Sequence, residues 1–320
     1  MKIMSAFVVL AMSVCAAAAD ELYPARPITI IVPFASGGGS DILARIVSKQ
    51  LEQVWKVPVV VENKAGAGGV TGALAGIRAA PDGYTLLLTG MTTLTANVAL
   101  YKKLPYNPAE FLPLAMAART PFVLVVNPKL PAQNLREFIQ FLKGRSEPLN
   151  YATTGPGAPH HLFMEFFMNQ TGVKLVPVPY KGTAPALNDV VAGHVPAMLA
   201  DLGPTIEHIS SGSLRALGVS TAQRVLEIGE VPTIGESVPG FDVASWQVFT
   251  VPAGTPRSQV QKLHNELKDI LAAKEVTQSI SSLGMIPMST GSVEEMQIFI
   301  KTQTELWGDI VRKAGIEGTL

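Results

Sequence analysis

The sequence predicts an α/β protein whose two lobes enclose a central cleft. Short β-branched runs alternate along the chain with amphipathic helical segments, and glycine-rich loops follow the strands. This type of unit recurs later in the chain, after an extended segment near residues 119–127, and a second extended segment follows near 240–248. We therefore expect a discontinuous first lobe at 20–124 plus 246–320 and a second lobe at 125–245.

The first α/β unit begins with a β-branched run of the kind that a strand buried on both faces requires. Glycine and polar residues at 36–41 end this strand and offer helix N-caps, and apolar residues then recur at helical spacing. A second glycine loop separates the next strand from the next helix. In chain order, we expect strands at 28–32, 58–61 and 84–88, and helices at about 42–54 and 70–80.

The later segments repeat the alternation of strand and helix, which predicts parallel sheets with crossover helices. Asn134 lies where it could cap the first of these later helices. We expect strands at 122–126, 149–152, 175–178, 197–200, 214–219 and 243–251, and helices at 134–142, 160–170, 184–192, 258–273 and 293–314.

Composition excludes several classes of function. The 320 residues carry 25 Lys and Arg against 25 Asp and Glu, so no net positive charge attracts the chain to nucleic acid. A single cysteine rules out a disulfide framework and a zinc site built on several thiolates. The dinucleotide motif is incomplete at both 37–42 and 66–71, where the third glycine is missing. We expect neither a cofactor nor a metal.

The first nineteen residues have the pattern of a secretory signal peptide. Lys2 precedes an apolar stretch, and a run of small residues ends at Ala19. The apolar stretch is shorter than the roughly 20 residues that span a bilayer. We expect cleavage near Ala19 and export of a soluble chain without cysteine, since Cys15 lies in the removed segment.

Four loops rich in glycine or small residues follow predicted strands, at 34–41, 65–69, 153–161 and 180–184. In open parallel sheets, the ligand crevice lies outside the carboxyl ends of the strands. A loop that leads into a helix N-terminus presents free N–H groups and the positive end of the helix dipole. The loops therefore favour an anionic ligand such as a carboxylate or a phosphate.

Other interpretations of single residues remain open from the sequence. Ser220 follows a strand within a segment that differs by one residue from a nucleophile elbow, and His161 with Glu165 could form an acid/base pair. Both would make the protein a hydrolase. Lys181 and Asp201 lie at loop positions that suit either ligand contact or solvent exposure.

Spaced motifs over essentially the whole chain after the signal peptide resemble the Bug family, the periplasmic solute receptors of tripartite tricarboxylate transporters. The motifs include Val32-Pro33-Phe34-Ala35 with Gly37, Gly38 and Asp41, then Glu62-Asn63, Gly66-Ala67-Gly68-Gly69, Ala80-Pro81-Asp82-Gly83, Asn150-Tyr151-Ala152, Val178-Pro179-Tyr180-Lys181-Gly182, and Ala253-Gly254-Thr255-Pro256.

The resemblance implies a type II periplasmic-binding fold whose lobes close around a small carboxylate, with no catalysis, and delivery of the ligand to inner-membrane permease subunits. A monomer is expected. Besides the hydrolase, a further alternative is a sensory binding protein that signals to a membrane kinase. The ligand-binding residues that the resemblance implies are Phe34, Ala35, Gly37, Gly38, Ser40, Asp41, Gly66, Ala67 and Gly68 in the first lobe, and Thr153, Thr154, Gly155, Gly157, Ala158, His161, Lys181, Gly182, Thr183, Ala184 and Asp201 in the second.

The sequence also departs from the family pattern at positions near the expected site. Val178 and Leu202 stand where His and Asn are frequent in the family, and Ser40 stands where Thr is usual. The absence of these polar side chains suggests that the end of the ligand away from its bound carboxylate differs from the corresponding end of a simple citrate-like acid. Asp201 could accept a hydrogen bond from a hydroxyl or an ammonium group there.

Overall fold

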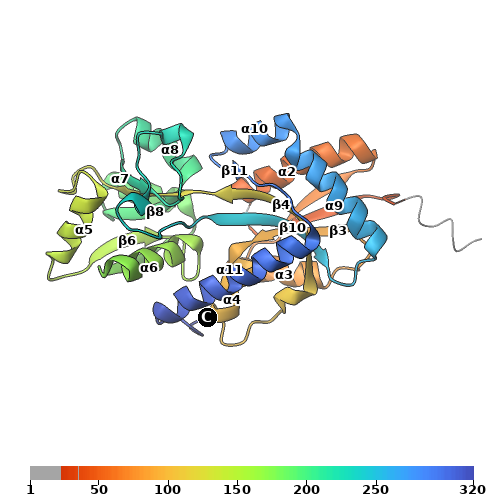
Figure 1. Cartoon of the computed structure of the whole chain (residues 1–320), viewed down its shortest axis with the longest axis horizontal. Coiled ribbons are helices and arrows are strands. Elements are labelled where there is room, and N and C mark those ends of the chain that lie inside the picture. Colours follow the sequence, from red (N-terminus) through yellow and green to blue (C-terminus); the bar gives the residue numbers. More distant parts are fainter. Residues whose placement is uncertain (1–22, 35) are drawn as a thin grey trace, which may run out of the picture.

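A computed structural model describes residues 23–34 and 36–320 of the chain. The expected signal peptide at 1–19 lies outside these residues, as does Ala35. Two β-sheets, each flanked by helices, lie side by side along the long axis of the molecule (Figure 1). Within the described ranges, no helix is both long enough and apolar enough to cross a membrane.

The first sheet has the strand order β2-β1-β3-β10-β4-β11. Its central strands are apolar on both faces, which is why β-branched runs predicted them. The strands are β1 (Ile28–Val32), β2 (Val59–Asn63), β3 (Thr85–Gly90), β4 (Phe111–Thr120), β10 (Ser245–Pro252) and β11 (Ile286–Pro287). The associated helices are α2 (Gly39–Trp55), α3 (Val70–Ile77), α4 (Asn97–Leu100), α9 (Arg257–Ala272), α10 (Lys274–Ser282) and α11 (Val293–Lys313).

The second sheet has the order β7-β6-β8-β5-β9. Its strands are β5 (Phe122–Val126), β6 (Leu149–Thr153), β7 (Leu175–Pro179), β8 (Ala197–Asp201) and β9 (Arg215–Val219). Its helices are α5 (Leu135–Lys143), α6 (Pro159–Thr171), α7 (Thr183–Ala192) and α8 (Leu202–Ser210). Asn134 caps α5 as expected, because its side chain accepts a hydrogen bond from the Glu137 N–H at 2.9 Å.

Parallel pairing is confirmed for β1 with β2 and β3, and for β6 with β7 and β8. The prediction of parallel pairing is wrong for the segments that link the sheets. β10 runs antiparallel to β3 and β4, and β5 runs antiparallel to β8 and β9. These strands enter a sheet from the opposite lobe rather than through a crossover helix, so their direction is reversed.

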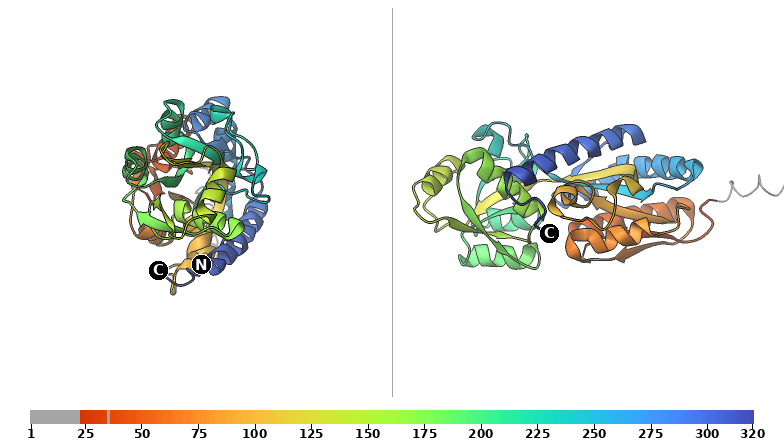
Figure 2. Two further views of the ribbon diagram at one scale, coloured as in Figure 1. Left: turned by 90° about the vertical axis from the view of Figure 1, so that its left-hand side faces the viewer. Right: turned by 90° about the horizontal axis from the view of Figure 1, so that it is seen from below.

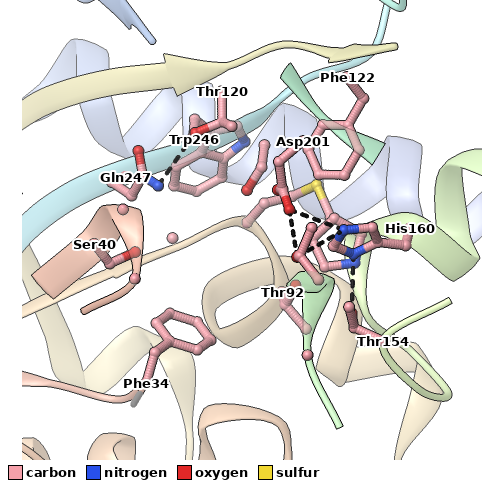
Figure 3. A pocket seen from close by; sticks show the side chains of 18 of the residues that line it. Phe34, Ser40, Thr92, Thr120, Phe122, Thr154, His160, Asp201, Trp246 and Gln247 are labelled. Carbon is pink, nitrogen blue, oxygen red and sulfur yellow. Dashed lines mark hydrogen bonds and ion pairs between the residues drawn. The ribbon is translucent and has the colours of Figure 1, made fainter. Parts of the chain in front are cut away.

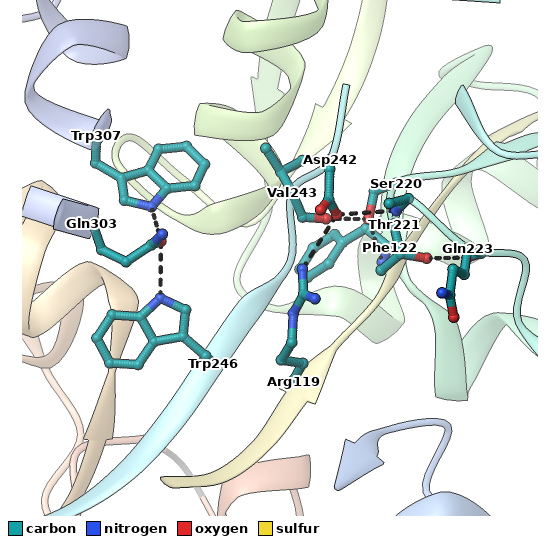
Figure 4. A network of polar contacts seen from close by, with 11 residues as sticks. Arg119, Phe122, Ser220, Thr221, Gln223, Asp242, Val243, Trp246, Gln303 and Trp307 are labelled. Atoms are coloured by element: carbon teal, nitrogen blue, oxygen red, sulfur yellow. Dashed lines mark hydrogen bonds and ion pairs between the residues drawn. The ribbon is translucent and has the colours of Figure 1, made fainter. Parts of the chain in front are cut away.

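The chain passes between the sheets at two neighbouring places. β4 ends at Thr120 and β5 begins at Phe122, so the sheets change at Pro121, a few residues before the boundary expected at 124. The return path runs from Ser220 to Ser245. The Ser220 hydroxyl joins the two crossings, because it accepts from the Phe122 N–H at 2.9 Å and donates to the Val243 carbonyl at 2.6 Å (Figure 4).

Helix α11 extends from the first sheet to the second lobe, as the right-hand view in Figure 2 shows. A capping box between Ser292 and Glu295 begins this helix. Its Trp307 side chain is 1% exposed and stacks on Phe163 of α6 with ring centroids 5.2 Å apart. The C-terminal helix therefore packs against both lobes.

Candidate functional site

Two adjoining cavities, of about 350 Å³ and about 720 Å³, lie between the lobes. Figure 3 shows residues of the smaller cavity, with Ser40 and Gln247 on one side and Asp201, His160 and Thr154 on the other. Both lobes and both crossings contribute to the walls. The two cavities share Ser36, Gly38, Gly39, Ser40, Thr120, Gly182, Thr183, Asp201 and Gln247.

The loop between β1 and α2 forms the first-lobe wall, and Asp41 fixes its shape. The Asp41 carboxylate accepts from the Gly37 N–H at 2.9 Å and from Ser36 Oγ at 3.2 Å. Burial raises the pKa of Asp41, but its bonds with Arg45 and Gly37 lower it more, to about 2. Gly37 has a φ of 84°, which favours glycine at this turn.

Two helix N-termini face the cavities from opposite lobes. Gly38 and Gly182 are the N-cap residues of α2 and α7, and neither helix has a side-chain capping bond. The first residues of both helices line the larger cavity. Their N–H groups and helix dipoles therefore favour a negative charge between them.

A polar cluster formed by Thr154, His160, Thr183 and Asp201 lies at the second-lobe side. His160 Nε2 is 3.0 Å from Asp201 Oδ2, and Thr183 Oγ1 donates to the same oxygen at 2.7 Å. Thr154 Oγ1 lies 2.9 Å from His160 Nδ1. Burial raises the pKa of Asp201, while His160 and Thr183 lower it, and the net pKa is below the usual value.

Two buried polar atoms of residues that line the smaller cavity have no hydrogen-bond partner within the described residues. They are Thr93 Oγ1 and Gln247 Oε1. The Gln247 amide nitrogen, by contrast, bonds Thr120 Oγ1 at 3.4 Å. Because buried polar groups in native proteins are nearly always paired, these two atoms need a partner that the described residues do not supply.

Ten of the sequence-predicted site residues line the cavities. These are Phe34, Gly37, Gly38, Ser40, Thr154, Lys181, Gly182, Thr183, Ala184 and Asp201. Nine other predicted residues do not line either cavity, namely Asp41, Gly66, Ala67, Gly68, Thr153, Gly155, Gly157, Ala158 and His161.

Several of the nine have other contacts. Asp41 shapes the first loop, as described above. The Ala67 carbonyl accepts from the Tyr101 hydroxyl at 3.1 Å. His161 is 7% exposed, accepts from the Gly157 N–H through Nδ1, and has Nε2 at 3.5 Å from Glu165. The loop at 66–68 follows β2, an edge strand of its sheet, which places it away from the central strands.

The sequence analysis missed further lining residues, which include Met91, Thr92, Thr93, Thr120, Phe122, His160, Trp246 and Gln247. A signal for the first three was present, because Gly90 and the threonines after it follow a predicted strand as the other loops do. No comparable signal marks Trp246 or Gln247, which lie within β10.

Comparisons with known proteins agree with this architecture. The profile of the family described as "Tripartite tricarboxylate transporter family receptor" matches residues 43–316. BugT of Bordetella pertussis is 35% identical over 305 residues, which cover 94% of this chain and 93% of that protein.

Solved structures extend the likeness to the fold. The structure titled "R. palustris Rpa4515 with adipate" has a TM-score of 0.84 and 32% identity, covering 92% of this chain and 99% of that one. MatC from Rhodopseudomonas palustris, titled "with bound malate", has a TM-score of 0.80 and 30% identity, covering 90% and 100%. The fold is therefore the two-lobed periplasmic-binding fold that the resemblance implied, and the chain belongs to the tripartite tricarboxylate transporter receptor family, which includes the Bug proteins.

Proposed function

We propose that this protein captures a small organic carboxylate between its two lobes, in the periplasm, and presents it to the permease subunits of a tripartite tricarboxylate transporter. The observation that carries the proposal is the convergence of the α2 and α7 N-termini on one space. The relatives titled with adipate and malate support the same class of ligand.

The cavity chemistry suits recognition by N–H groups rather than by an arginine. Among the described lining residues, Lys181 is the only Lys or Arg, and its side chain is exposed. A partly buried charge at a helix N-terminus is stabilised by up to ~2 kcal/mol per helix. Two such helices, together with the hydroxyl group of Ser40, provide enough donors for one carboxylate.

The hydrolase interpretation has no support from the geometry. The Ser220 hydroxyl is fully buried and is occupied by the Phe122 N–H and the Val243 carbonyl. Neither Ser220 nor His161 lines the cavities between the lobes. We therefore propose binding without catalysis, with closure of the lobes as the change that a permease recognises.

Thermal unfolding with a panel of carboxylates tests the proposal. A ligand at one hundred times its Kd stabilises the folded state by about 2.7 kcal/mol, so the binding acid raises Tm, whereas its methyl ester does not. Ser40→Asp places a negative charge in the wall of both cavities and should weaken binding at least ~10-fold, since it repels the ligand carboxylate. Ser40→Asn is the uncharged control of matched size and should bind more tightly than Ser40→Asp.

Loss of binding in Ser40→Asp does not reflect unfolding, because an acidic residue in the first turn of α2 favours the helix. Equal affinity of the two Ser40 variants, or the absence of any carboxylate that raises Tm, contradicts the proposed function. Retention of the solubilised permease subunits by the immobilised, liganded receptor tests delivery separately.

A further inference from the structure

We infer that His160 gains a proton when the ligand carboxylate binds, so that the site captures the anion together with a proton. This inference rests on the proposed function and deepens it, because it names the residue that balances the charge of the bound ligand. Its basis is a carboxylate of the protein, Asp201, that lies beside the place proposed for the ligand carboxylate. A second negative charge there is offset when a neighbouring group becomes positive.

Asp201 lies at the start of α7. Thr183 is the first residue of this helix, and its Oγ1 donates to Asp201 Oδ2 at 2.7 Å. Burial raises the pKa of Asp201, but His160 and Thr183 lower it below its usual value, so the group is ionised at neutral pH. Asp201 also lines both cavities. A carboxylate held by the α7 N–H groups therefore approaches a negative charge of the protein, and two like charges in a partly buried site repel each other.

His160 is placed to offset this repulsion. Its Nε2 lies 3.0 Å from Asp201 Oδ2 and 3.4 Å from Thr183 Oγ1. The residue lines the smaller cavity, and its ring packs edge-on against Phe122 with centroids 5.0 Å apart. Histidine is the side chain whose charge ordinarily changes near neutral pH. A ligand anion beside His160 and Asp201 favours the imidazolium form, because the positive ring then faces two negative groups.

The neighbours of the His160 ring accommodate both protonation states (Figure 3). Ionised Asp201 can only accept, so in the neutral ring Nε2 carries the proton and Nδ1 accepts from Thr154 Oγ1 at 2.9 Å. When Nδ1 takes up a proton from solvent, it donates to the same hydroxyl oxygen. A threonine hydroxyl can donate or accept, so only its hydrogen has to rotate. The imidazolium form therefore keeps both hydrogen bonds of the ring.

Among the described residues, the other groups near His160 are uncharged, paired or exposed. On α6 itself, His161 Nε2 lies 3.5 Å from Glu165. Helix α11 contacts α6 through the stacked ring of Trp307. Lys181 lines the larger cavity, but its side chain is exposed to solvent. The His160 imidazole is therefore the group that can gain charge in response to the ligand.

The test measures the protons taken up on binding, by titration calorimetry of the mature protein with a carboxylate panel that includes adipate and malate. At about pH 7, the slope of the binding enthalpy against the ionisation enthalpy of the buffer gives the number of protons per ligand. We expect uptake of at least ~0.3 proton per ligand, and affinity at least ~3-fold tighter at about pH 6.5 than at about pH 8.5. Adipate and malate are ionised over this range, so the free acids contribute no titration of their own.

His160→Gln is the test variant. Glutamine keeps an N–H donor for Asp201 but cannot be protonated, so uptake should fall below ~0.1 proton per ligand and the pH dependence should disappear. Thr154→Val removes the acceptor of the protonated Nδ1 and should at least halve the uptake, because a charged donor without a partner is costlier than a neutral acceptor. Far-UV circular dichroism and Tm of each variant confirm folding.

His194→Gln is the matched control. The His194 side chain is 72% exposed, lies 3.3 Å from Asp189 and does not line the cavities, so proton uptake should equal that of the wild type. Carboxylate binding by the wild type without proton uptake overturns the inference, as does uptake retained in folded His160→Gln, which would place the proton on Asp201 or on the ligand. Either result leaves the proposed function intact, whereas binding of no carboxylate overturns both.

Discussion

Trp307 of α11 stacks on Phe163 of α6, with ring centroids 5.2 Å apart and an interplanar angle of 30°. The contact joins helix α11 of the C-terminal segment to the second lobe. In the same molecule, the chain itself passes between the lobes at Pro121 and near Ser220. Both rings are almost completely buried. The pair therefore belongs to the packed interior as well as to the junction between the lobes.

Replacing Trp307 with Leu should lower the free energy of unfolding by about 2–4 kcal/mol, because a buried ring is lost and the remaining space is only partly filled. Urea denaturation measures the change. Leu306→Ala on the same helix is the control, since Leu306 is 39% exposed and its replacement should cost less than ~1 kcal/mol. Equal losses of unfolding free energy in the two variants would show that the stacked Trp307 ring stabilises the protein no more than the exposed Leu306 side chain does.

Gln303 accepts hydrogen bonds from two indoles through one oxygen. The Nε1 atoms of Trp246 and Trp307 each lie 3.2 Å from Gln303 Oε1 (Figure 4). Gln303→Leu leaves both N–H groups unpaired and should destabilise the protein by about 2 kcal/mol or more. Gln303→Glu retains an acceptor and should recover at least half of the loss in the same denaturation experiment.

Gly90 leaves no room for a side chain where β3 meets β10. A Cβ at this position would lie 1.9 Å from the Trp246 carbonyl oxygen, and Gly90 pairs with Gln247 in the ladder. Gly90→Ala should therefore displace β10 and lower Tm by several degrees, and it should also weaken ligand binding because Trp246 and Gln247 line the cavity.

Gly144→Ala is the matched control for this substitution. A Cβ at Gly144 would have its nearest contact at 3.6 Å, and the residue has a φ of −82°, which alanine adopts freely. We expect Tm to stay constant or rise slightly. A Gly90→Ala protein as stable as Gly144→Ala would contradict the close approach of the two strands.

Asp41 should make stability depend on pH in the acid range. Its pKa is about 2 in the folded protein, below the usual 3.8, so its contribution is complete above about pH 4 and is lost as pH falls toward about 2. The shift corresponds to about 2 kcal/mol for this buried side chain. Asp41→Asn should therefore be less stable than the wild type at neutral pH.

The difference in Tm between wild type and Asp41→Asn should narrow between about pH 4 and pH 2. A constant difference over this range would show that Asp41 does not ionise with a lowered pKa. Glu62→Gln is a control, because Glu62 pairs with Lys64 on the exposed surface.

Local patterns predicted the strands better than the helices. β1 and β5 begin and end at the predicted residues, because β-branched runs with turn residues beside them have few alternatives. α2 begins at Gly39, within the run of glycine and polar residues at 36–41 that offered N-caps and before the first apolar residue of its periodic face. β4 was expected only as an extended crossing near 119, because Pro113 and several alanines weaken its strand pattern.

The helix α8 was missed for a similar reason. Gly203 and Pro204 directly follow β8 and would normally mark a turn. Proline is, however, tolerated in the first turn of a helix, where its missing N–H would have no intrahelical partner. The combination therefore begins a helix here instead of ending a strand in a loop.

The choice between two adjacent histidines could not be made from the sequence. Successive residues of a helix point about 100° apart, so only one of His160 and His161 can face the cavity. The structure turns His160 toward Asp201 and His161 toward Gly157 and Glu165. That rotation depends on how α6 packs against its sheet, and on contacts from residues distant in the sequence.

The most direct measurement is a crystal structure of the mature protein with the carboxylate that raises its Tm most. We predict electron density for one carboxylate group between the first residues of α2 and those of α7, within hydrogen-bond distance of backbone N–H groups from both lobes. A ligand bound elsewhere on the surface, or a carboxylate held by one lobe only with the lobes apart, would contradict capture between the lobes.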